Sequence, residues 1–387
     1  MTVLLPGATL GVMGGGQLGR MFVHAAQAMG YFTAVLDPDP DSPAGRVSHY
    51  HVQGDYLDEI ALATLWGHSD AITTEFENVP AQALARLAEH RFVAPGAAAV
   101  AIAQDRALEK AHFTRCGVPC APNTVIATED ELAHVADDLL PGILKTARLG
   151  YDGKGQLRVA TRAGLRSAWD SLQRVPCVLE KMLPLAFECS VLVARGADGA
   201  MVNLPVQRNL HRDGILAVTE VFDGCVAPLQ AQQAVAATRA IAEGLGYVGV
   251  LCVEFFGLAD GSLVVNEMAP RPHNSGHWSL DASDVSQFEL QVRTLAGLPL
   301  TQPRQHSPAF MLNLLGDLWF TRGGSETTPD WAAVLALPGT HLHLYGKLNA
   351  RPGRKMGHLT VTGASVDAAR ATASQAAALL GLPASWP

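Results

Sequence analysis

The chain has 387 residues, 48% of them hydrophobic, and its 28 lysines and arginines against 36 acids give a net charge of −8. This length predicts two or three domains, and an acidic chain without a basic tail argues against a nucleic-acid binder. Six scattered cysteines without a C-x-x-C pair predict free thiols in a reducing cytosol, and we expect no targeting segment and no membrane span.

The first elements predict an α/β unit that begins with a glycine-rich turn. A strand over 8–14 runs into G-G-G-Q-L-G-R, a helix follows over 18–29, and a strand over 33–36 stops at Asp37. A G-x-G-x-x-G turn after a strand, with an acid after the next strand, is formally a dinucleotide-binding pattern, which would make the protein an NAD(P)-dependent dehydrogenase. The same glycines fit close backbone packing and an anion-friendly helix N-terminus.

Two further segments of this region carry charges in suggestive places. A strand over 71–74 delivers Glu75 and Glu77 past its carboxyl end, where open α/β sheets bind ligands, although a solvated loop is the alternative. A helix over 98–116 carries Asp105, Arg106 and Lys110, which indicate either a binding face or ordinary solvated charge.

The middle of the chain contains a lysine in a buried strand followed by a glycine loop. Lys145 lies within an apolar strand over 142–146, so its ammonium group needs an anion to offset desolvation. The loop G-Y-D-G-K-G-Q over 150–156 has amides that can close over phosphates, or it is a ligand-free turn. No Walker A motif is present, so this is not a P-loop protein.

A β-hairpin over 249–269 carries the candidate metal site. Its strands flank Asp260 and Gly261, and a two-residue turn there places Glu254 directly opposite Glu267, with Cys252 and Val265 on the same face. Opposed carboxylates repel each other. A Mg²⁺ ion, which takes one or two carboxylates plus substrate phosphates, removes the conflict; an exposed hairpin with two solvated acids is the alternative, disfavoured by the apolar flanks.

Two basic or polar runs follow the hairpin. The run M-A-P-R-P-H-N-S-G-H brings Arg271, His273 and Asn274 beside the paired acids, as an anionic substrate requires. A helix over 283–296 precedes a last unit with strands near 311–315, 341–345 and 358–361 and a helix over 366–380. Between its strands, residues 347–355 hold four cations, Lys347, Arg351, Arg354 and Lys355, which predict a phosphate-binding turn unless the turn is simply solvated.

These motifs, taken in order, resemble the ATP-grasp superfamily and, more narrowly, its family of 5-(carboxyamino)imidazole ribonucleotide synthetases. The resemblance rests on G-G-G-Q-L-G-R-M, E-F-E-N-V, D-R-x-x-x-K, G-Y-D-G-K-G-Q, N-E-M-A-P-R-P-H-N-S-G-H and R-P-G-R-K-M-G-H. It implies an α/β fold (α+β overall) with a Rossmann-like N-terminal pre-ATP-grasp domain over 1–97, a two-lobed ATP-grasp domain over 98–298 and a small β-rich domain over 299–387.

The resemblance also implies the chemistry. It implies a cytoplasmic homodimer of purine biosynthesis that uses ATP, bicarbonate and 5-aminoimidazole ribonucleotide, with Mg²⁺, or alternatively Mn²⁺, as cofactor. Another ATP-grasp carboxylate–amine ligase, a nucleotide-binding protein without turnover and an NAD(P)-dependent dehydrogenase are the alternatives.

Individual roles follow from the same resemblance. Metal binding falls to Glu254 and Glu267, and catalysis to Lys145, Asp152, Arg271, His273 and Asn274. The resemblance assigns binding of the ribonucleotide to Gln17, Leu18, Glu75, Tyr151, Arg271, Lys347, Arg354 and Lys355. It assigns binding of ATP to Arg106, Lys145, Gly150, Tyr151, Asp152, Gly153, Lys154, Gly155, Gln156, Glu180, Lys181, Met182, Leu183, Glu188, His211, Asn266 and Glu267. The chain departs from the family pattern at Leu204 and Arg208, where Tyr and a neutral or acidic residue are expected.

Overall fold

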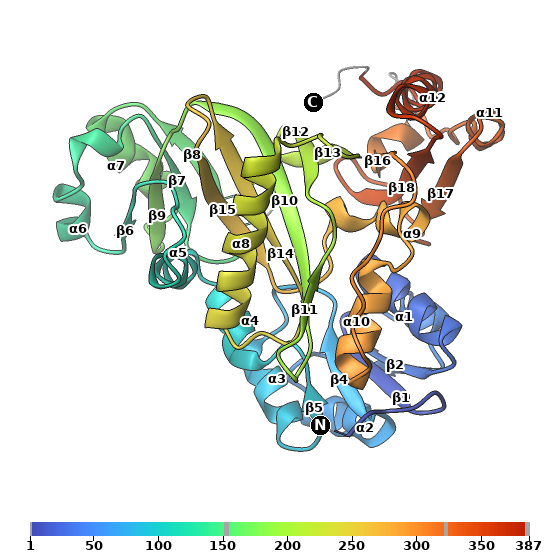
Figure 1. Ribbon diagram of the computed structural model, residues 1–387. Coiled ribbons are helices and arrows are strands. Elements are labelled where there is room, and N and C mark those ends of the chain that lie inside the picture. The colour runs from blue at the N-terminus through green and yellow to red at the C-terminus, as the bar shows by residue number, and fades with distance from the viewer. Residues whose placement is uncertain (1, 151–154, 321–323, 384–387) are drawn as a thin grey trace.

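A computed structural model describes residues 2–150, 155–320 and 324–383, arranged around three β-sheets (Figure 1). The first sheet is parallel throughout, in the order β3-β2-β1-β4-β5. Its strands β1, β2 and β4 are largely buried because helices cover both faces, as parallel sheets require. The elements are β1 (Thr9–Met13), α1 (Gln17–Ala28), β2 (Phe32–Asp37), β3 (Tyr50–Gln53), α2 (Glu59–His68), β4 (Ala71–Thr74), α3 (Ala81–Ala88) and β5 (Phe92–Val93).

A helix from much later in the chain completes the core of this first unit. Helix α10 (Gln287–Ala296) lies beside α1 (Figure 1), and its residues Phe288, Val292 and Leu295 pack with Phe22. The predicted start of this helix is wrong: Ser286, whose side chain accepts a hydrogen bond from the Glu289 amide at 3.1 Å, is the N-cap in place of Ser283. Its predicted end at Gly297 is confirmed.

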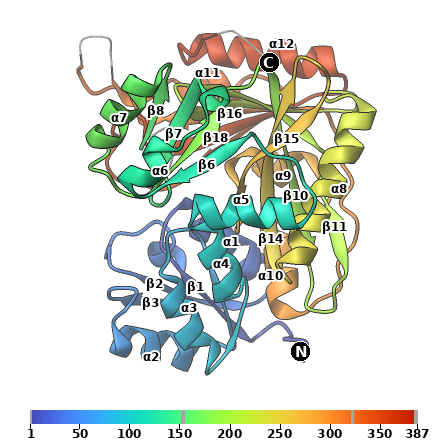
Figure 2. The same ribbon diagram turned by 90° about the vertical axis from the view of Figure 1, so that its left-hand side faces the viewer.

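The predicted single helix over 98–116 is two helices, α4 (Ala97–Ala103) and α5 (Arg106–Arg115). Asp105 separates them in an extended conformation, and its carboxylate accepts hydrogen bonds from the amides of Ala107 and Leu108. An aspartate that caps a helix stops the preceding one, because its side chain competes for the backbone donors. Figure 2 shows α5 between the N-terminal unit and the four-stranded sheet described next.

The second sheet is antiparallel, in the order β6-β9-β7-β8. Helices α6 and α7 supply the apolar residues that pack against one face, among them Leu132, Leu165 and Trp169. The predicted glycine loop connects β7 to β8, and its residues Tyr151, Asp152, Gly153 and Lys154 lie outside the described residues. The elements are β6 (Asn123–Ile126), α6 (Glu129–Ala133), β7 (Gly142–Thr146), β8 (Gln156–Val159), α7 (Arg162–Ser171) and β9 (Cys177–Lys181).

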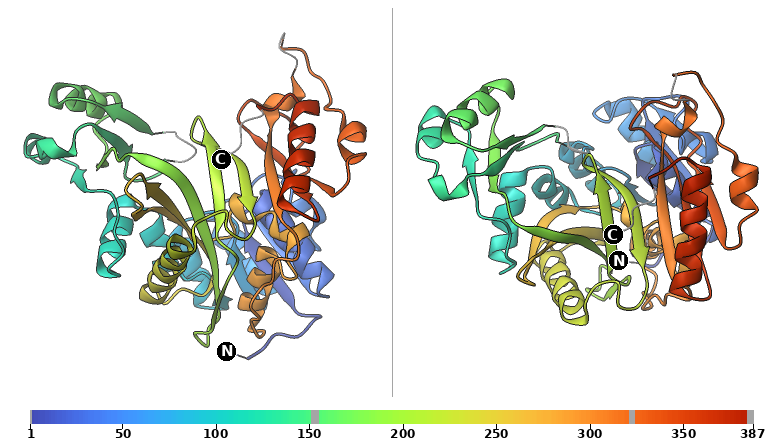
Figure 3. Two further views of the ribbon diagram at one scale, coloured as in Figure 1. Left: turned by 45° about the horizontal axis from the view of Figure 1, so that its top comes forward. Right: turned by 90° about the horizontal axis from the view of Figure 1, so that it is seen from above.

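The third sheet has nine antiparallel strands, in the order β15-β14-β10-β12-β13-β16-β18-β17, with β11 paired to β10. It lies between the four-stranded sheet and α12 (Figure 3). Strand β16 pairs with β13, so the C-terminal strands extend the central sheet. The elements are β10 (Leu185–Arg195), β11 (Met201–Asn203), β12 (Gln207–Arg212), β13 (Ile215–Val221), α8 (Pro228–Gly244), β14 (Gly249–Leu258), β15 (Leu263–Ala269), α9 (Ser279–Ala282), β16 (Ala309–Leu315), α11 (Trp331–Leu335), β17 (Thr340–Leu344), β18 (Lys355–Thr362) and α12 (Val366–Leu379).

The β14–β15 hairpin places Glu254 opposite Glu267 as predicted, although the turn was predicted wrongly. Leu258 and Ser262 close a loop of three residues that ends at Gly261, which has φ +86. The register then shifts between Glu254 and Phe255, and this bulge compensates for the additional loop residue. Val265 consequently pairs with Phe255 and packs in that residue's core cluster, so its predicted place on the Glu254 face is wrong.

Two expectations from composition can be compared directly with the structure. All six cysteines are free, as predicted. Among the described residues, no helix combines the length and the apolar character that crossing a membrane would demand.

Candidate active site

A cavity of about 840 Å³ is lined by segments from the N-terminal sheet, α5, the β14–β15 hairpin and the turn before β18. Most of the candidate ribonucleotide, metal and catalytic residues meet there. They are Gln17, Leu18, Glu75, Glu254, Glu267, Arg271, His273, Asn274, Lys347, Arg354 and Lys355, and the ATP candidates Arg106 and Gly150 line the cavity with them. The other described candidates do not line it: Lys145, Gly155, Gln156, Glu180, Lys181, Met182, Leu183, Glu188, His211 and Asn266.

The glycine-rich turn before α1 presents its amides to carboxylates of the protein itself. The Gly15 amide donates to Asp37 at 2.6 Å, and Glu75 accepts from the amides of Gly16 at 3.0 Å and Gly19 at 3.1 Å. A Cβ on Gly16 would lie 2.5 Å from the Glu75 carboxylate, so glycine is needed for this approach. Burial raises the pKa of Glu75, while the amides oppose that rise. These donors are not free for a pyrophosphate, which argues against a dinucleotide site.

The paired acids of the hairpin have different surroundings. Glu254 is 9% exposed, and its Oε1 has no hydrogen-bond partner among the described residues. Burial raises the pKa of Glu254 to about 7, and the nearby charge of Glu267 contributes. Burial also disfavours the charge on Glu267, but the Arg106 guanidinium, 3.0 Å away, lowers the pKa of that carboxyl. An unsatisfied buried carboxylate beside a second one fits a divalent cation.

Lys145 has an anionic partner within the protein, Glu180, which was itself predicted to bind ATP. Its Nζ donates to Glu180 at 2.8 Å, and Lys110 lies 3.3 Å from the other oxygen of that carboxylate. Burial lowers the pKa of Lys145, although Glu180 opposes this. Glu180 therefore satisfies the requirement for an anion near Lys145. The following amides, of Lys181 and Met182, donate to the carbonyls of Pro122 and Pro141.

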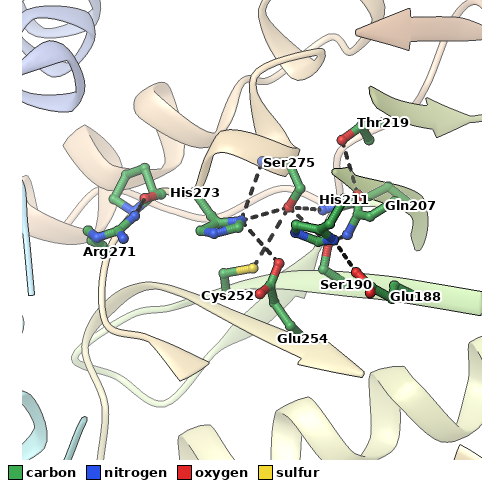
Figure 4. Close-up of polar contacts among 12 residues, drawn as sticks. Glu188, Ser190, Gln207, His211, Thr219, Cys252, Glu254, Arg271, His273 and Ser275 are labelled. Atoms are coloured by element: carbon green, nitrogen blue, oxygen red, sulfur yellow. Dashed lines mark hydrogen bonds and ion pairs between the residues drawn. The ribbon is translucent and has the colours of Figure 1, made fainter. Parts of the chain in front are cut away.

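Glu188 and His211 form a close ion pair across β10 and β12 (Figure 4). Burial disfavours the imidazolium ion, but the hydrogen bond to Glu188 and the charge of Glu254 raise the pKa of His211. The His211 imidazole therefore lies close enough to the hairpin carboxylates, Glu254 and Glu267, for their charges to favour its protonation.

Ser275 is the centre of a buried polar network around Glu254 (Figure 4). Its hydroxyl lies 2.9 Å from His273 Nδ1, and it accepts from Ser190 at 2.8 Å and Gln207 at 3.2 Å. Burial and Arg271 lower the pKa of His273 well below its ordinary value, so this imidazole is neutral. The network fixes the orientation of a neutral His273 within the cavity wall.

Arg271 forms a partly buried ion pair with Glu77, and the side-chain amide of Asn274, three residues later, has no hydrogen-bond partner among the described residues. The guanidinium Nε donates to Glu77, and Nη1 donates to the carbonyl of Pro272 at 2.9 Å. Burial opposes both charges, yet each partner stabilises the other, so the pKa of Glu77 is lowered and that of Arg271 raised. Asn274 is 7% exposed, and neither its Oδ1 nor its Nδ2 has a partner among the described residues.

The basic turn, residues 347–355, is held in place by neutral and acidic groups. Asp317 accepts from the Gly353 amide at 2.8 Å, and Arg354 donates to the Asn349 carbonyl at 2.6 Å. Gly316 permits close backbone contact, because a Cβ there would lie 2.2 Å from the Arg351 carbonyl. Burial and the charge of Arg354 lower the pKa of Lys347 to about 8. Mutual repulsion among these cations favours an anionic ligand.

Several residues with clear structural roles were not among the predicted site residues. Glu77 lies two positions after Glu75, and this spacing at a strand end could have indicated a shared face. Lys110 belonged to the charged face predicted on this helix, whereas Glu109, also on α5, carried no such signal. The departures at Leu204 and Arg208 do not reach the cavity: Leu204 is fully buried, and the Arg208 guanidinium lies 5.5 Å from the centre of the Phe187 ring.

Comparison with known proteins matches three family models along the chain. They are the ribonucleotide synthetase preATP-grasp domain at 7–104, the ATP-grasp domain at 111–288 and the phosphoribosylaminoimidazole carboxylase C-terminal domain at 309–372. A relative from Brucella melitensis, N5-carboxyaminoimidazole ribonucleotide synthase, is 43% identical over 93% of this chain and 97% of its own.

Solved structures agree over nearly the whole length. The ADP complex of an N5-carboxyaminoimidazole ribonucleotide synthetase has a TM-score of 0.90 at 37% identity, over 97% of this chain and 98% of that one. The Aspergillus clavatus synthase in complex with ADP and 5-aminoimidazole ribonucleotide has a TM-score of 0.87 at 30% identity, over 98% and 100% of the two chains.

Proposed function

The chain belongs to the ATP-grasp family of N5-carboxyaminoimidazole ribonucleotide synthases, and on this premise we propose that it carboxylates 5-aminoimidazole ribonucleotide with bicarbonate. It is an ATP-dependent ligase of purine biosynthesis. The overall reaction converts ATP, bicarbonate and 5-aminoimidazole ribonucleotide into ADP, phosphate and N5-carboxyaminoimidazole ribonucleotide. A bicarbonate oxygen attacks the γ-phosphoryl group to form carboxyphosphate and ADP. Loss of phosphate then gives CO₂, which the exocyclic amine captures as it loses a proton.

One observation carries the proposal: a single cavity holds the Glu254 and Asn274 side chains with unsatisfied buried atoms, together with Arg271 and the basic turn. Buried polar atoms without partners are costly, so a ligand that supplies partners is favoured. The cavity therefore suits a substrate with one anionic end at the basic turn and a reacting end at Arg271.

The chain's own residues act mainly by positioning and charge stabilisation, as phosphoryl transfer requires. Glu254 and Glu267 would hold Mg²⁺, or Mn²⁺, which neutralises charge on the ATP phosphates. Arg271, held by Glu77, stabilises the bicarbonate-derived anion, and the Asn274 amide donates to it. Neutral His273 is held by Ser275 to orient the same group.

The remaining assignments belong to the proposal as well. ATP lies between the two ATP-grasp lobes, along β9, with Lys145 near its phosphates and with the glycine loop of residues 150–156 as the predicted phosphate-binding segment. The domains are 1–97, 98–298 and 299–387. We place the enzyme in the cytoplasm, on the basis of its free thiols, and we expect a homodimer.

The decisive experiment measures ADP release from the full chain with ATP, Mg²⁺ and 5-aminoimidazole ribonucleotide, with and without added bicarbonate in degassed buffer. We expect release that depends on both the ribonucleotide and bicarbonate, with N5-carboxyaminoimidazole ribonucleotide as the product. Release that is supported by formate instead would indicate another ATP-grasp ligase. ATP binding without any release would indicate a nucleotide-binding protein.

Replacing Arg354 with alanine should raise the KM for the ribonucleotide by about 10-fold or more, because the variant loses one charged hydrogen bond to phosphate. The phosphate does not change during the reaction, so ground state and transition state lose the same binding energy and kcat changes little. Steady-state kinetics with each substrate varied in turn measures this effect.

The control for this experiment is Arg166→Ala, which removes an equal charge from α7, where Arg166 pairs with Glu129. It should leave both KM values unchanged. A collapse of ATP affinity in Arg354→Ala, with ribonucleotide affinity intact, would assign the basic turn to the nucleotide instead.

A further inference from the structure

Helix α5 contacts three consecutive residues of β15 through one face. Arg106 lies 3.0 Å from the Glu267 carboxylate, Lys110 donates to the Asn266 carbonyl at 2.6 Å, and Glu109 accepts from the Met268 amide at 2.7 Å. Positions i, i+3 and i+4 share a helix face, so a single helix surface reaches the main chain on both sides of Glu267 and also its side chain.

These contacts lie on the outer edge of β15, next to the register shift in its pairing with β14. The strand is at the edge of the nine-stranded sheet, with β14 as its one neighbour in the strand order. The register shift also lies here, between the pairs Glu254–Glu267 and Phe255–Val265, and it leaves Asn266 as the additional residue. Bulges interrupt the ladder and edge strands lack one set of partners. Glu109 and Lys110 therefore supply bonds that a further strand would otherwise provide.

We infer that Glu109 is a positioning residue for the metal site: its carboxylate fixes the Met268 amide and thereby holds Glu267 beside Glu254. The inference rests on the proposed function, in which Glu267 is a metal ligand. The Glu109 side chain is 2% exposed, and its charge lies near Lys110 and Arg106. Burial raises the pKa of Glu109 to about 7.

The geometry explains why the bond matters for the metal more than for the ribonucleotide. Arg106 attracts the Glu267 carboxylate toward α5. With the Met268 amide released, the outer edge of β15 keeps only the bonds from Lys110 to the Asn266 carbonyl and from the Val265 amide to the Pro119 carbonyl. Within the described residues, the main chain that follows Glu267 then has no bond to α5, so we expect Glu267 to be held less firmly beside Glu254. The basic turn, Gln17 and Glu75 lie on other segments, so we expect ribonucleotide binding to change little.

Two conservative variants of Glu109 separate the effect of its side-chain length from the effect of its charge. Glu109→Asp keeps the negative charge but shortens the side chain by one methylene, which breaks the bond to the Met268 amide. Glu109→Gln keeps the reach and a carbonyl acceptor but loses the charge. Both variants are close in size to glutamate, and thermal unfolding of each checks that the fold is intact.

The readout is the Mg²⁺ concentration for half-maximal ADP release, measured with the KM for the ribonucleotide. We expect Glu109→Asp to raise the Mg²⁺ requirement by about 10-fold or more, and Glu109→Gln to stay within about 3-fold of the parent enzyme. Both should keep the ribonucleotide KM within about 2-fold. Glu131→Ala is the matched control, because Glu131 also accepts backbone amides, from Ala127 and Thr128, but lies on α6.

The possible outcomes are distinguishable. An unchanged Mg²⁺ requirement in Glu109→Asp would overturn the inference while leaving the metal assignment intact, provided that Glu267→Gln is inactive. Equal losses in Glu109→Asp and Glu109→Gln would also overturn it, because charge and not the amide bond would then be responsible. Normal turnover by Glu267→Gln would instead refute the metal assignment within the proposed function.

Discussion

Replacing Glu267 with glutamine is expected to lower ATP turnover by about 10²-fold or more at saturating Mg²⁺, without unfolding the protein. The substitution removes the repulsion between the opposed carboxylates of Glu254 and Glu267, so the hairpin retains its pairing. It also removes a negative ligand from the proposed metal site, where charge stabilisation of the phosphates is the main contribution to catalysis. Steady-state ADP release across a range of Mg²⁺ concentrations measures the loss.

Asp260→Asn is the matched control for this variant. Asp260 lies in the loop of the same hairpin, where its carboxylate accepts hydrogen bonds from the amide and hydroxyl of Ser262. Asparagine can accept the same bonds, so turnover should remain near that of the parent enzyme. If Glu267→Gln also turned over at a near-normal rate, the paired acids would not hold the metal.

Arg271→Lys is expected to reduce turnover by about 10²-fold while changing the melting temperature little. Removing the charge altogether would leave the partly buried Glu77 without its partner and would destabilise the fold. Lysine keeps a positive charge for Glu77 but cannot present the planar fork that stabilises an anion through several parallel hydrogen bonds. Turnover and thermal unfolding, measured on one preparation, separate the two effects.

Arg293→Lys serves as the control for this prediction. Arg293 pairs with Glu289 on α10, again as a partly buried ion pair, and it does not line the cavity. Turnover of this variant should be normal. If Arg271→Lys retained normal turnover as well, Arg271 would serve only as the structural partner of Glu77.

Local patterns predicted most of the elements that carry the candidate site. Alternation and turn residues predicted β1, β4, β7 and β16 to within a few residues, because these strands are buried and bounded by glycine or polar residues. The break at Asp105 was missed, since an aspartate between Gln104 and Arg106 resembles an ordinary surface position of a continuous helix. The short edge strand β5, of two residues, carries no periodic signal.

Contacts between distant segments could not be predicted by the same means. Lys145 was expected to need an anionic ligand, whereas Glu180, 35 positions later, already provides the charge. Arg271 meets Glu77 across 194 positions. Glu254 was predicted opposite Glu267 on the assumption of a two-residue turn, and the prediction is confirmed only because the bulge offsets the third loop residue. Neither the three-residue loop nor the bulge has a local sequence signal.

The continuity of the nine-stranded sheet has a consequence for how the two ends of the cavity stay matched. Five strand-to-strand steps separate β14, which carries Glu254, from β18, which begins at Lys355. At about 4.8 Å per step this is about 24 Å along the sheet, a length set by backbone hydrogen bonds. The sheet therefore fixes the distance between Glu254 and the basic turn. Substitutions along β12, β13 or β16 can alter side-chain packing without altering that distance. Only a change in the number of strands, or in the bulges within them, would change the distance between the two ends of the cavity.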